Sequence, residues 1–237
     1  MVNTALYTII AVLPSIVWLL FYLRKDVHPE PNRMVTKIFY WGILATLAAL
    51  ALEFLYSNVL TTFSLQNISL LVIGGAAFIE EYLKYFVVKI KVLKNPEFDE
   101  PIDAMLYLII AALGFAAAEN VFLLNGLYSV GMPIKDAFQV ALGRFVSATF
   151  LHALASGIVG YFLAHSLIMK RRERKSFVGL GILIATCLHG IYNYIIMELE
   201  PRNENFIILL GVLLVFMAIS VSLAFKNLNK IKSICKL

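Results

Sequence analysis

The chain has 237 residues, of which 61% are hydrophobic and only 15% are charged, and its formal net charge is +5. Its mean hydropathy is +0.84, whereas a soluble domain is usually about 45–50% apolar and about 25% charged. These values exclude a soluble enzyme, a disordered chain and a nucleic-acid-binding module, despite the positive charge.

Seven apolar segments follow one another along the chain, separated by short polar connectors that contain proline or glycine. Each is long enough for a transmembrane helix, which takes about 20 residues. Strands are disfavoured because an open sheet edge in lipid would leave backbone groups unpaired. The sequence therefore predicts an all-α, polytopic integral membrane bundle of about seven transmembrane helices, with residues 1–237 as a single membrane domain. The segments are 3–23, 36–59, 66–90, 102–128, 137–168, 176–197 and 204–225.

Lysine and arginine alternate between the connectors. The first, third and fifth connectors and the C-terminal tail carry four, three, five and four of them, and the other connectors carry none or one. Because cytoplasmic loops are enriched in these residues, we expect the N-terminus outside and the C-terminus in the cytoplasm, in the cell membrane. The basic residues then mark topology, with contact to headgroups of the lipid bilayer as a second role. No nucleic-acid partner is needed to explain them.

Six charged residues and two histidines remain inside the predicted spans. A charged side chain at mid-helix costs about 2.5–3.5 kcal/mol, so these groups must be paired, protonated or hydrated in a shared cavity. Any one of them could serve packing or pairing alone, but the set indicates a functional site. The residues are Glu53, Glu80, Glu81, Lys84, Glu119, Arg144, His152 and His189. Glu53 is expected near the outer end of its span and is left outside the site.

The third segment contains two adjacent glutamates followed by a lysine. Glu80 and Lys84 are four residues apart and share a helix face, and Glu81 is three residues from Lys84. Two neighbouring carboxylates in a low dielectric do not both ionise cheaply, so one becomes a base beside an acid, as water activation requires. Which of the two is the base stays open. The alternative is a structural ion pair with one glutamate at the headgroups.

The fourth segment reads Gly-Phe-Ala-Ala-Ala-Glu-Asn at 114–120. Small residues let a neighbouring helix approach closely. We therefore expect Glu119 and Asn120 to point into a tight interface and not into lipid. The alternative role is an interhelical hydrogen bond to Arg144 or to a serine.

The fifth and sixth segments each carry a deep histidine. His152 is flanked by Thr149 and Ser156 on one polar stripe, and His189 shares a face with Asn193. A histidine and an amide side by side could donate hydrogen bonds to a developing oxyanion. A single histidine on an apolar helix is usually a satisfied core group, but two of them with three deep glutamates favour a site.

Taken in order, these motifs resemble the PrsW family of glutamic intramembrane proteases, within a wider superfamily that includes the CAAX-protein endopeptidases. The protease-like core covers about residues 25–197. The matching stretches are Glu-Pro at 30–31, Phe-Ile-Glu-Glu-Tyr-Leu-Lys at 78–84, Phe-Asp-Glu at 98–100, Gly-Phe-Ala-Ala-Ala-Glu-Asn at 114–120, His-Ala at 152–153 and Leu-His-Gly-Ile-Tyr-Asn at 188–193.

The resemblance implies peptide-bond hydrolysis in a single-pass membrane protein, typically an anti-sigma factor cut on its extracytoplasmic side. In this family Glu80 or Glu81 would activate water, and the transition state would be stabilised by histidine and Asn193. The implied catalytic residues are Glu80, Glu81, Glu119, His152 and His189, supported by Lys84, Asn120, Arg144 and Asn193.

Metal dependence is open, because the family has been viewed both as metal-dependent and as metal-free. Glutamate and histidine at helical spacing could bind Zn²⁺, but the chain has no His-Glu-x-x-His motif. The paired carboxylates beside Lys84 favour metal-free general-base hydrolysis, so no cofactor is expected.

Two further functions are compatible with buried glutamate and histidine. A proton-coupled transporter or channel uses such groups as a relay, although no inverted repeat is evident here. A non-catalytic scaffold could also keep the protease-like fold and bind a partner helix.

Overall fold

The computed structural model describes residues 2–26, 28–198 and 204–231, and within these ranges every regular element is an α-helix. The helices are α1 (Val2–Leu23), α2 (Asn32–Thr62), α3 (Ser69–Lys91), α4 (Pro101–Ser129), α5 (Ile134–Val146), α6 (Ala148–Leu167), α7 (Arg171–Glu198) and α8 (Glu204–Leu228). Six stretches of the described chain are long and apolar enough to cross a membrane. The prediction of an all-α, multi-pass membrane protein is confirmed.

The third predicted segment, α3, is not among these six stretches. Its 23 residues are long enough for a span, but the helix contains Glu80, Glu81 and Lys84 together with two terminal lysines. Three of these five charges are buried. The charged residues that lower the hydropathy of α3 thus lie mostly in the interior of the bundle, so α3 is not a surface helix.

The fifth predicted segment differs from the expectation of one continuous helix. It is divided at Ser147, whose backbone leaves the helical region. Near the break, the carbonyl of Phe145 accepts a hydrogen bond from the indole N–H of Trp18 on α1, at 2.8 Å. The Ser147 hydroxyl donates to the carbonyl of Gly143 at 2.7 Å. In both bonds a backbone carbonyl accepts from a side chain in addition to the helical backbone pattern. The next helix, α6, begins at Ala148, four residues before His152.

The central helix is α4, which packs against every other described helix except α7. All residues from Pro101 to Ala118 are buried. Its crossing with α2 depends on two glycines, because a side chain at Gly42 would collide with the carbonyl of Ala111 and one at Gly114 with the carbonyl of Phe39. The close approach expected of small residues in α4 is confirmed. It fixes the position of α4, and with it Glu119, relative to α2.

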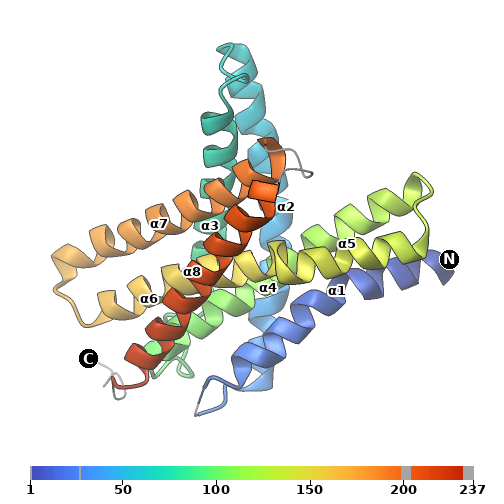
Figure 1. Ribbon diagram of the computed structural model, residues 1–237. Coiled ribbons are helices and arrows are strands. Elements are labelled where there is room, and N and C mark those ends of the chain that lie inside the picture. The colour runs from blue at the N-terminus through green and yellow to red at the C-terminus, as the bar shows by residue number, and fades with distance from the viewer. Residues whose placement is uncertain (1, 27, 199–203, 232–237) are drawn as a thin grey trace.

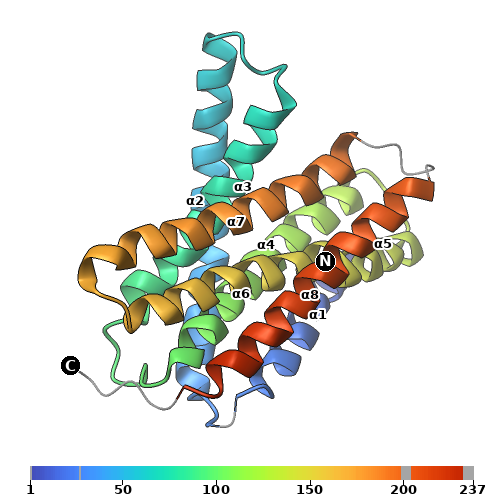
Figure 2. The same cartoon turned by 60° about the vertical axis from the view of Figure 1, so that its left-hand side comes forward.

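The α2–α3 hairpin crosses the α6–α7 pair steeply and extends beyond it, as Figures 1 and 2 both show. The middle of α3 packs inside the bundle against α4, α6 and α7, whereas its first residues stand clear. The first residues of α3 therefore separate from α7 close to the point where α3 carries its buried charges.

Candidate active site

Four helices bring their polar side chains to one buried cluster inside the bundle. The cluster contains all five residues expected to be catalytic, together with the lysine of α3. Each of its members contacts at least one other through a hydrogen bond or an ion pair. The residues are Glu80, Glu81 and Lys84 from α3, Glu119 from α4, His152 from α6 and His189 from α7.

Lys84 lies at the centre of this cluster and is fully buried. Its Nζ lies 2.8 Å from Glu81 Oε1, 3.3 Å from Glu80 Oε2 and 2.7 Å from His152 Nδ1. The same ammonium lies 4.5 Å from the centre of the Phe115 ring. Because an unpaired charge is very costly in a low dielectric, this lysine is stable only with its carboxylate partners in place.

Glu81 has both carboxylate oxygens engaged. Oε1 contacts Lys84 and accepts from His189 Nδ1 at 2.9 Å, and Oε2 accepts from the hydroxyl of Ser156 at 3.1 Å. The side chain has no exposed surface. The contacts of Glu81 thus link α3 to α6 and α7, with both of its carboxylate oxygens occupied.

His152 also has both ring nitrogens engaged. Since the ammonium of Lys84 can only donate, Nδ1 is the acceptor, and Nε2–H donates to Glu119 Oε2 at 2.8 Å. Glu119 in turn lies 3.4 Å from Arg144 at the end of α5. This chain of contacts orients the imidazole and fixes its tautomer.

Asn120 completes the same side of the site. Its carbonyl oxygen accepts from Arg144 Nε, and its amide donates to the hydroxyl of Thr149 at 3.1 Å. The interhelical bond to Arg144 considered from the sequence is therefore present, for both Glu119 and Asn120. The break at Ser147 separates Arg144 from Thr149 and His152, yet Asn120 contacts residues on both sides of it.

Glu80 differs from its neighbour in having a less engaged carboxylate. Beyond Lys84 at 3.3 Å, the nearest cluster nitrogens are His152 Nδ1 at 3.8 Å and His189 Nε2 at 3.9 Å. Its side chain is 10% exposed, against 0% for Glu81. The rings of His152 and His189 stand edge to face above it, 5.1 Å apart. Glu80 and His189 Nε2 thus form the edge of the cluster with spare hydrogen-bonding capacity.

Asn193 is the one expected site residue without a contact to the cluster. It lies one turn beyond His189 and is half-buried, and no hydrogen bond between described residues joins it to the other site residues. Its role in oxyanion binding stays a prediction.

Two contacts to the site come from residues that the sequence did not single out for a role. Ser156 bonds Glu81, and its spacing of four from His152 is the signal for it. Phe115 lies under Lys84, and its spacing of four from Glu119 places both on one face of α4. Glu53, expected near the outer end of its span, is half-buried on α2.

Glu80, His152 and His189 have the donor chemistry of a zinc site. Each offers one ligand atom, and these atoms lie within 4.8 Å of one another. One carboxylate and two imidazoles are a usual Zn²⁺ set, so these residues fit such an ion. Lys84 contacts two of the three, Glu80 and His152, and so already supplies them with a positive charge.

Known proteins similar to this chain are proteases. The family model described as "PrsW family intramembrane metalloprotease" matches residues 30–223. Protease PrsW of Bacillus subtilis (strain 168) is 28% identical over 180 residues, covering 76% of this chain and 77% of the relative. Protease PrsW of Clostridioides difficile (strain 630) is 26% identical over 194 residues, covering 80% and 78%. No solved structure matches the chain.

Proposed function

Because this chain belongs to the PrsW family of intramembrane metalloproteases, and is therefore a multi-pass membrane peptide hydrolase, we propose that it cleaves a single-pass membrane protein of the anti-sigma-factor kind. Water activation by Glu80 is the catalytic part of this proposal, and the observation that carries it is the unequal engagement of the two adjacent glutamates. Glu81 is saturated by three partners, whereas Glu80 has one long contact and faces His189 Nε2.

Glu80 is the general base in this proposal. A base must keep a lone pair free for the proton that it accepts, and only Glu80 of the pair does so. It takes a proton from water as the water oxygen attacks the scissile carbonyl carbon. The proton then passes from Glu80 to the leaving amine as the carbon–nitrogen bond breaks, so that the carboxylate is regenerated.

His189 stabilises the oxyanion that forms in this step. Its Nδ1–H is bound to Glu81, which leaves Nε2 directed to the Glu80 side of the cluster. Three carboxylates face two permanent cations, Lys84 and Arg144, so one added proton balances the cluster. With that proton, His189 Nε2–H donates to the oxyanion, in the manner of a preorganised oxyanion hole.

The other cluster residues position these two groups. Lys84 holds Glu80 through their ion pair, Glu81 orients the ring of His189, and Glu119 orients the ring of His152. A zinc ion, when bound by Glu80, His152 and His189, supplies a Lewis acid and a more acidic water. Metal content of the purified protein, measured before and after dialysis against a chelator and compared with His189→Ala, reports whether these residues hold one.

An apolar groove beside the site supports a transmembrane helix as the substrate. It has a volume of about 470 Å³ and lies between α3 and α7, which carry Glu80 and His189. Gly74 and Gly190 line it, and a side chain at either would meet open space. The hydroxyl of Thr186, which also lines it, is buried without a partner among the described residues. Small residues and an unpaired hydroxyl are the features that receive a helix in lipid.

The depth of the site supports cleavage towards the extracytoplasmic side. At 1.5 Å per residue, Glu119 lies about 15 Å from the end of α4 and about 27 Å from its start, and His189 lies about 14 Å from the end of α7 and about 27 Å from its start. Glu80 lies midway along α3, about 17 Å from its start, so the two residues on α4 and α7 are the ones that indicate a side. In the predicted orientation the ends of α4 and α7 are outside.

A cleavage assay tests the function. Epitope-tagged single-pass membrane proteins, anti-sigma factors among them, are co-expressed with the wild-type chain or with Glu80→Gln, and the products are resolved by immunoblot. We expect one or more substrates to be cut by the wild type and by the exposed matched control Glu173→Gln, but not by Glu80→Gln. Cleavage at the wild-type rate by Glu80→Gln would refute the assignment.

The groove is tested with its own cysteine. Cys187 is exposed and lines the groove, so a substrate with one cysteine in its transmembrane helix should form a disulfide with it in a Cys235→Ser background. Gly190→Leu should weaken this cross-link and raise KM, whereas Gly179→Leu, at another open position on α7, should do neither. Equal cross-linking in both variants would place the substrate elsewhere.

A further inference from the structure

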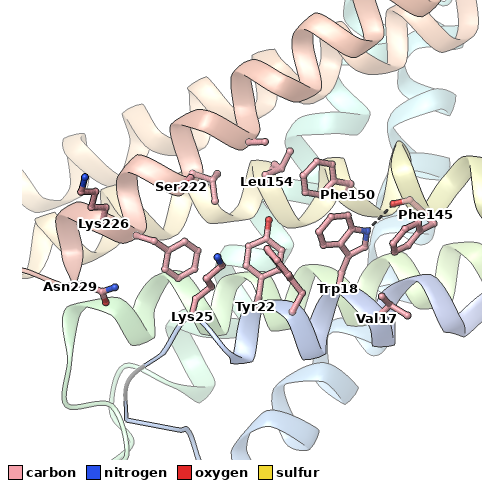
Figure 3. A pocket seen from close by; sticks show the side chains of 14 residues that line it. Val17, Trp18, Tyr22, Lys25, Phe145, Phe150, Leu154, Ser222, Lys226 and Asn229 are labelled. Atoms are coloured by element: carbon pink, nitrogen blue, oxygen red, sulfur yellow. Dashed lines mark hydrogen bonds between the residues drawn. The ribbon is translucent and has the colours of Figure 1, made fainter.

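A second groove lies away from the catalytic cluster, where α1 and α8 face the α5–α6 break. It has a volume of about 580 Å³. Figure 3 shows its lining, in which aromatic rings fill one end and amine and amide groups lie at the other. The groove is thus amphiphilic along its length, which the α3–α7 groove is not.

The apolar end is a preformed aromatic surface. The indole of Trp18 stacks on Phe150 with ring centres 4.2 Å apart and on Phe145 at 5.2 Å. Its N–H is bound to the carbonyl of Phe145, as the dashed line in Figure 3 marks. Further along, Tyr22 stacks on Phe225 of α8 at 6.0 Å. These contacts hold the rings in place without a ligand.

The polar end carries two lysines and one amide. Lys25 follows α1, Lys226 lies in the last turn of α8, and Asn229 follows one turn later. Neither lysine forms an ion pair with a carboxylate of the described chain. Lys25 lies 4.7 Å from the ring of Phe21. By the predicted topology this end is cytoplasmic, where anionic lipids attract basic residues.

The dimensions agree with a lipid acyl chain. From Lys25 to Val17 the groove follows α1 for about 12 Å, and from Asn229 to Ala218 it follows α8 for about 16 Å. An occupant with a negative head and an apolar tail would match both ends, because the lysines and the amide can donate to phosphate oxygens.

We propose that this groove is a selective binding site for one anionic phospholipid of the cytoplasmic leaflet, with its phosphate at Lys25, Lys226 and Asn229 and an acyl chain along Trp18 and Tyr22. A transmembrane peptide helix fits the polar end less well, because it brings no phosphate to the two lysines. The site belongs to the resting protein and does not depend on the proposed proteolysis.

The intrinsic tryptophans provide the test. The chain has two, Trp18 and Trp41, so Trp41→Phe leaves Trp18 as the only fluorophore. The protein is reconstituted in phosphatidylcholine vesicles to which brominated phosphatidylglycerol or brominated phosphatidylcholine is added, and quenching gives their relative affinity at Trp18. We expect phosphatidylglycerol to be preferred about ten- to thirtyfold, from about 1 kcal/mol per lysine.

Matched variants separate a built site from general surface charge. Lys25→Gln/Lys226→Gln should abolish the preference, whereas Lys89→Gln/Lys94→Gln, which removes the same charge from another cytoplasmic segment, should keep it. Ala218→Phe should block quenching by both lipids, and Ala224→Phe, on another face of α8, should not.

Equal quenching by the two lipids, or equal loss of the preference in both double lysine variants, would overturn the proposal. So would unchanged quenching in Ala218→Phe. If a transmembrane peptide protects Trp18 from brominated phosphatidylglycerol while the lysine variants have no effect, the groove is a peptide site and the lipid assignment is wrong.

Discussion

Two groups of carboxylates lie at different heights in this bundle, and they are stabilised in opposite ways. The inner group, Glu80, Glu81 and Glu119, is paired with Lys84, Arg144 and two histidines. The second group is Asp26, Glu30 and Asp103, whose oxygens lie within 4.8 Å of one another where the α1–α2 connector meets α4. We call it the outer group because it lies at the ends of its helices, which the predicted topology places on the cytoplasmic side. Within the described chain, neither Glu30 nor Asp103 forms an ion pair with a lysine or arginine.

The outer group is held by neutral donors instead. Tyr107 donates to Glu30 Oε2, and Asp103 Oδ2 accepts from the backbone N–H groups of Asp99 and Glu100. Burial raises the pKa of Glu30 to about 8, with the charge of Asp103 acting in the same direction and the Tyr107 hydrogen bond opposing it. The comparison teaches that buried carboxylates can keep their charge where cations compensate them, and hold a proton where none do.

The largest expected effect comes from removing the compensation of the inner group. Lys84→Met leaves two adjacent buried carboxylates without their common cation, and breaking a buried ion pair in this way costs about 3–5 kcal/mol. We expect a loss of that size in the free energy of unfolding, together with loss of cleavage. Denaturant unfolding in detergent measures it, with Lys89→Met, exposed on the same helix, as the control.

The two variants should therefore differ clearly. If Lys84→Met unfolds at the same denaturant concentration as Lys89→Met, the inner carboxylates do not need Lys84 for their stability, and the contrast between the two groups fails.

A smaller effect is expected at the rim of the inner group. Arg144 contacts Glu119 and Asn120 and its side chain is 23% exposed, so its ion pair is only partly buried and should stabilise the fold less than the fully buried pairs of Lys84 do. Arg144→Gln should leave unfolding nearly unchanged but lower kcat about tenfold, because His152 loses part of its orientation through Glu119.

Restoration of kcat by Arg144→Lys, which keeps the charge near Glu119, would distinguish this positioning role from a steric one. Arg172→Gln, exposed at the start of α7, is the control. Wild-type kcat in Arg144→Gln would remove Arg144 from the site.

The smallest effect concerns the outer group and depends on pH. Since the folded pKa of Glu30 is about 8 and its ordinary value is 4.5, the folded state binds a proton that the unfolded state releases in this range. Its stabilising contribution is complete below pH 4.5 and is lost as the pH rises through 8. The Tm should therefore fall between about pH 5 and 9, and it should fall less in Glu30→Gln, which cannot ionise.

Glu173→Gln, an exposed glutamate, should follow the wild-type curve. Parallel curves for the wild type and Glu30→Gln would mean that Glu30 is ionised in the fold, as the inner glutamates are expected to be.

Features within one helix were predictable from the sequence. The spacing of Glu80, Glu81 and Lys84 predicts their shared face because the helical period is known, and the small residues before Glu119 predict a tight crossing. The alternation of lysine and arginine likewise gives a definite topology to test.

Contacts between helices were harder to predict from the sequence, because they depend on the crossing angles of the helices and on the vertical register of each span. The bond between Lys84 and His152, and the saturation of Glu81 by His189 and Ser156, follow from that register. The break at Ser147 has a partner in Trp18, far away in the sequence. No periodicity within residues 137–168 indicates it.

The central claim is that two adjacent glutamates have different tasks, Glu80 in the chemistry and Glu81 in the structure. Its most direct test measures cleavage rate and Tm together for Glu80→Gln and Glu81→Gln. We predict that Glu80→Gln lowers kcat by about 10²–10⁴, as for a lost general base, and lowers the Tm only slightly, because Lys84 keeps its shorter ion pair with Glu81. Glu81→Gln should lower the Tm markedly, because Lys84 and His189 both lose their charged partner. The opposite pattern, or equal losses of rate and Tm in both variants, would contradict the account.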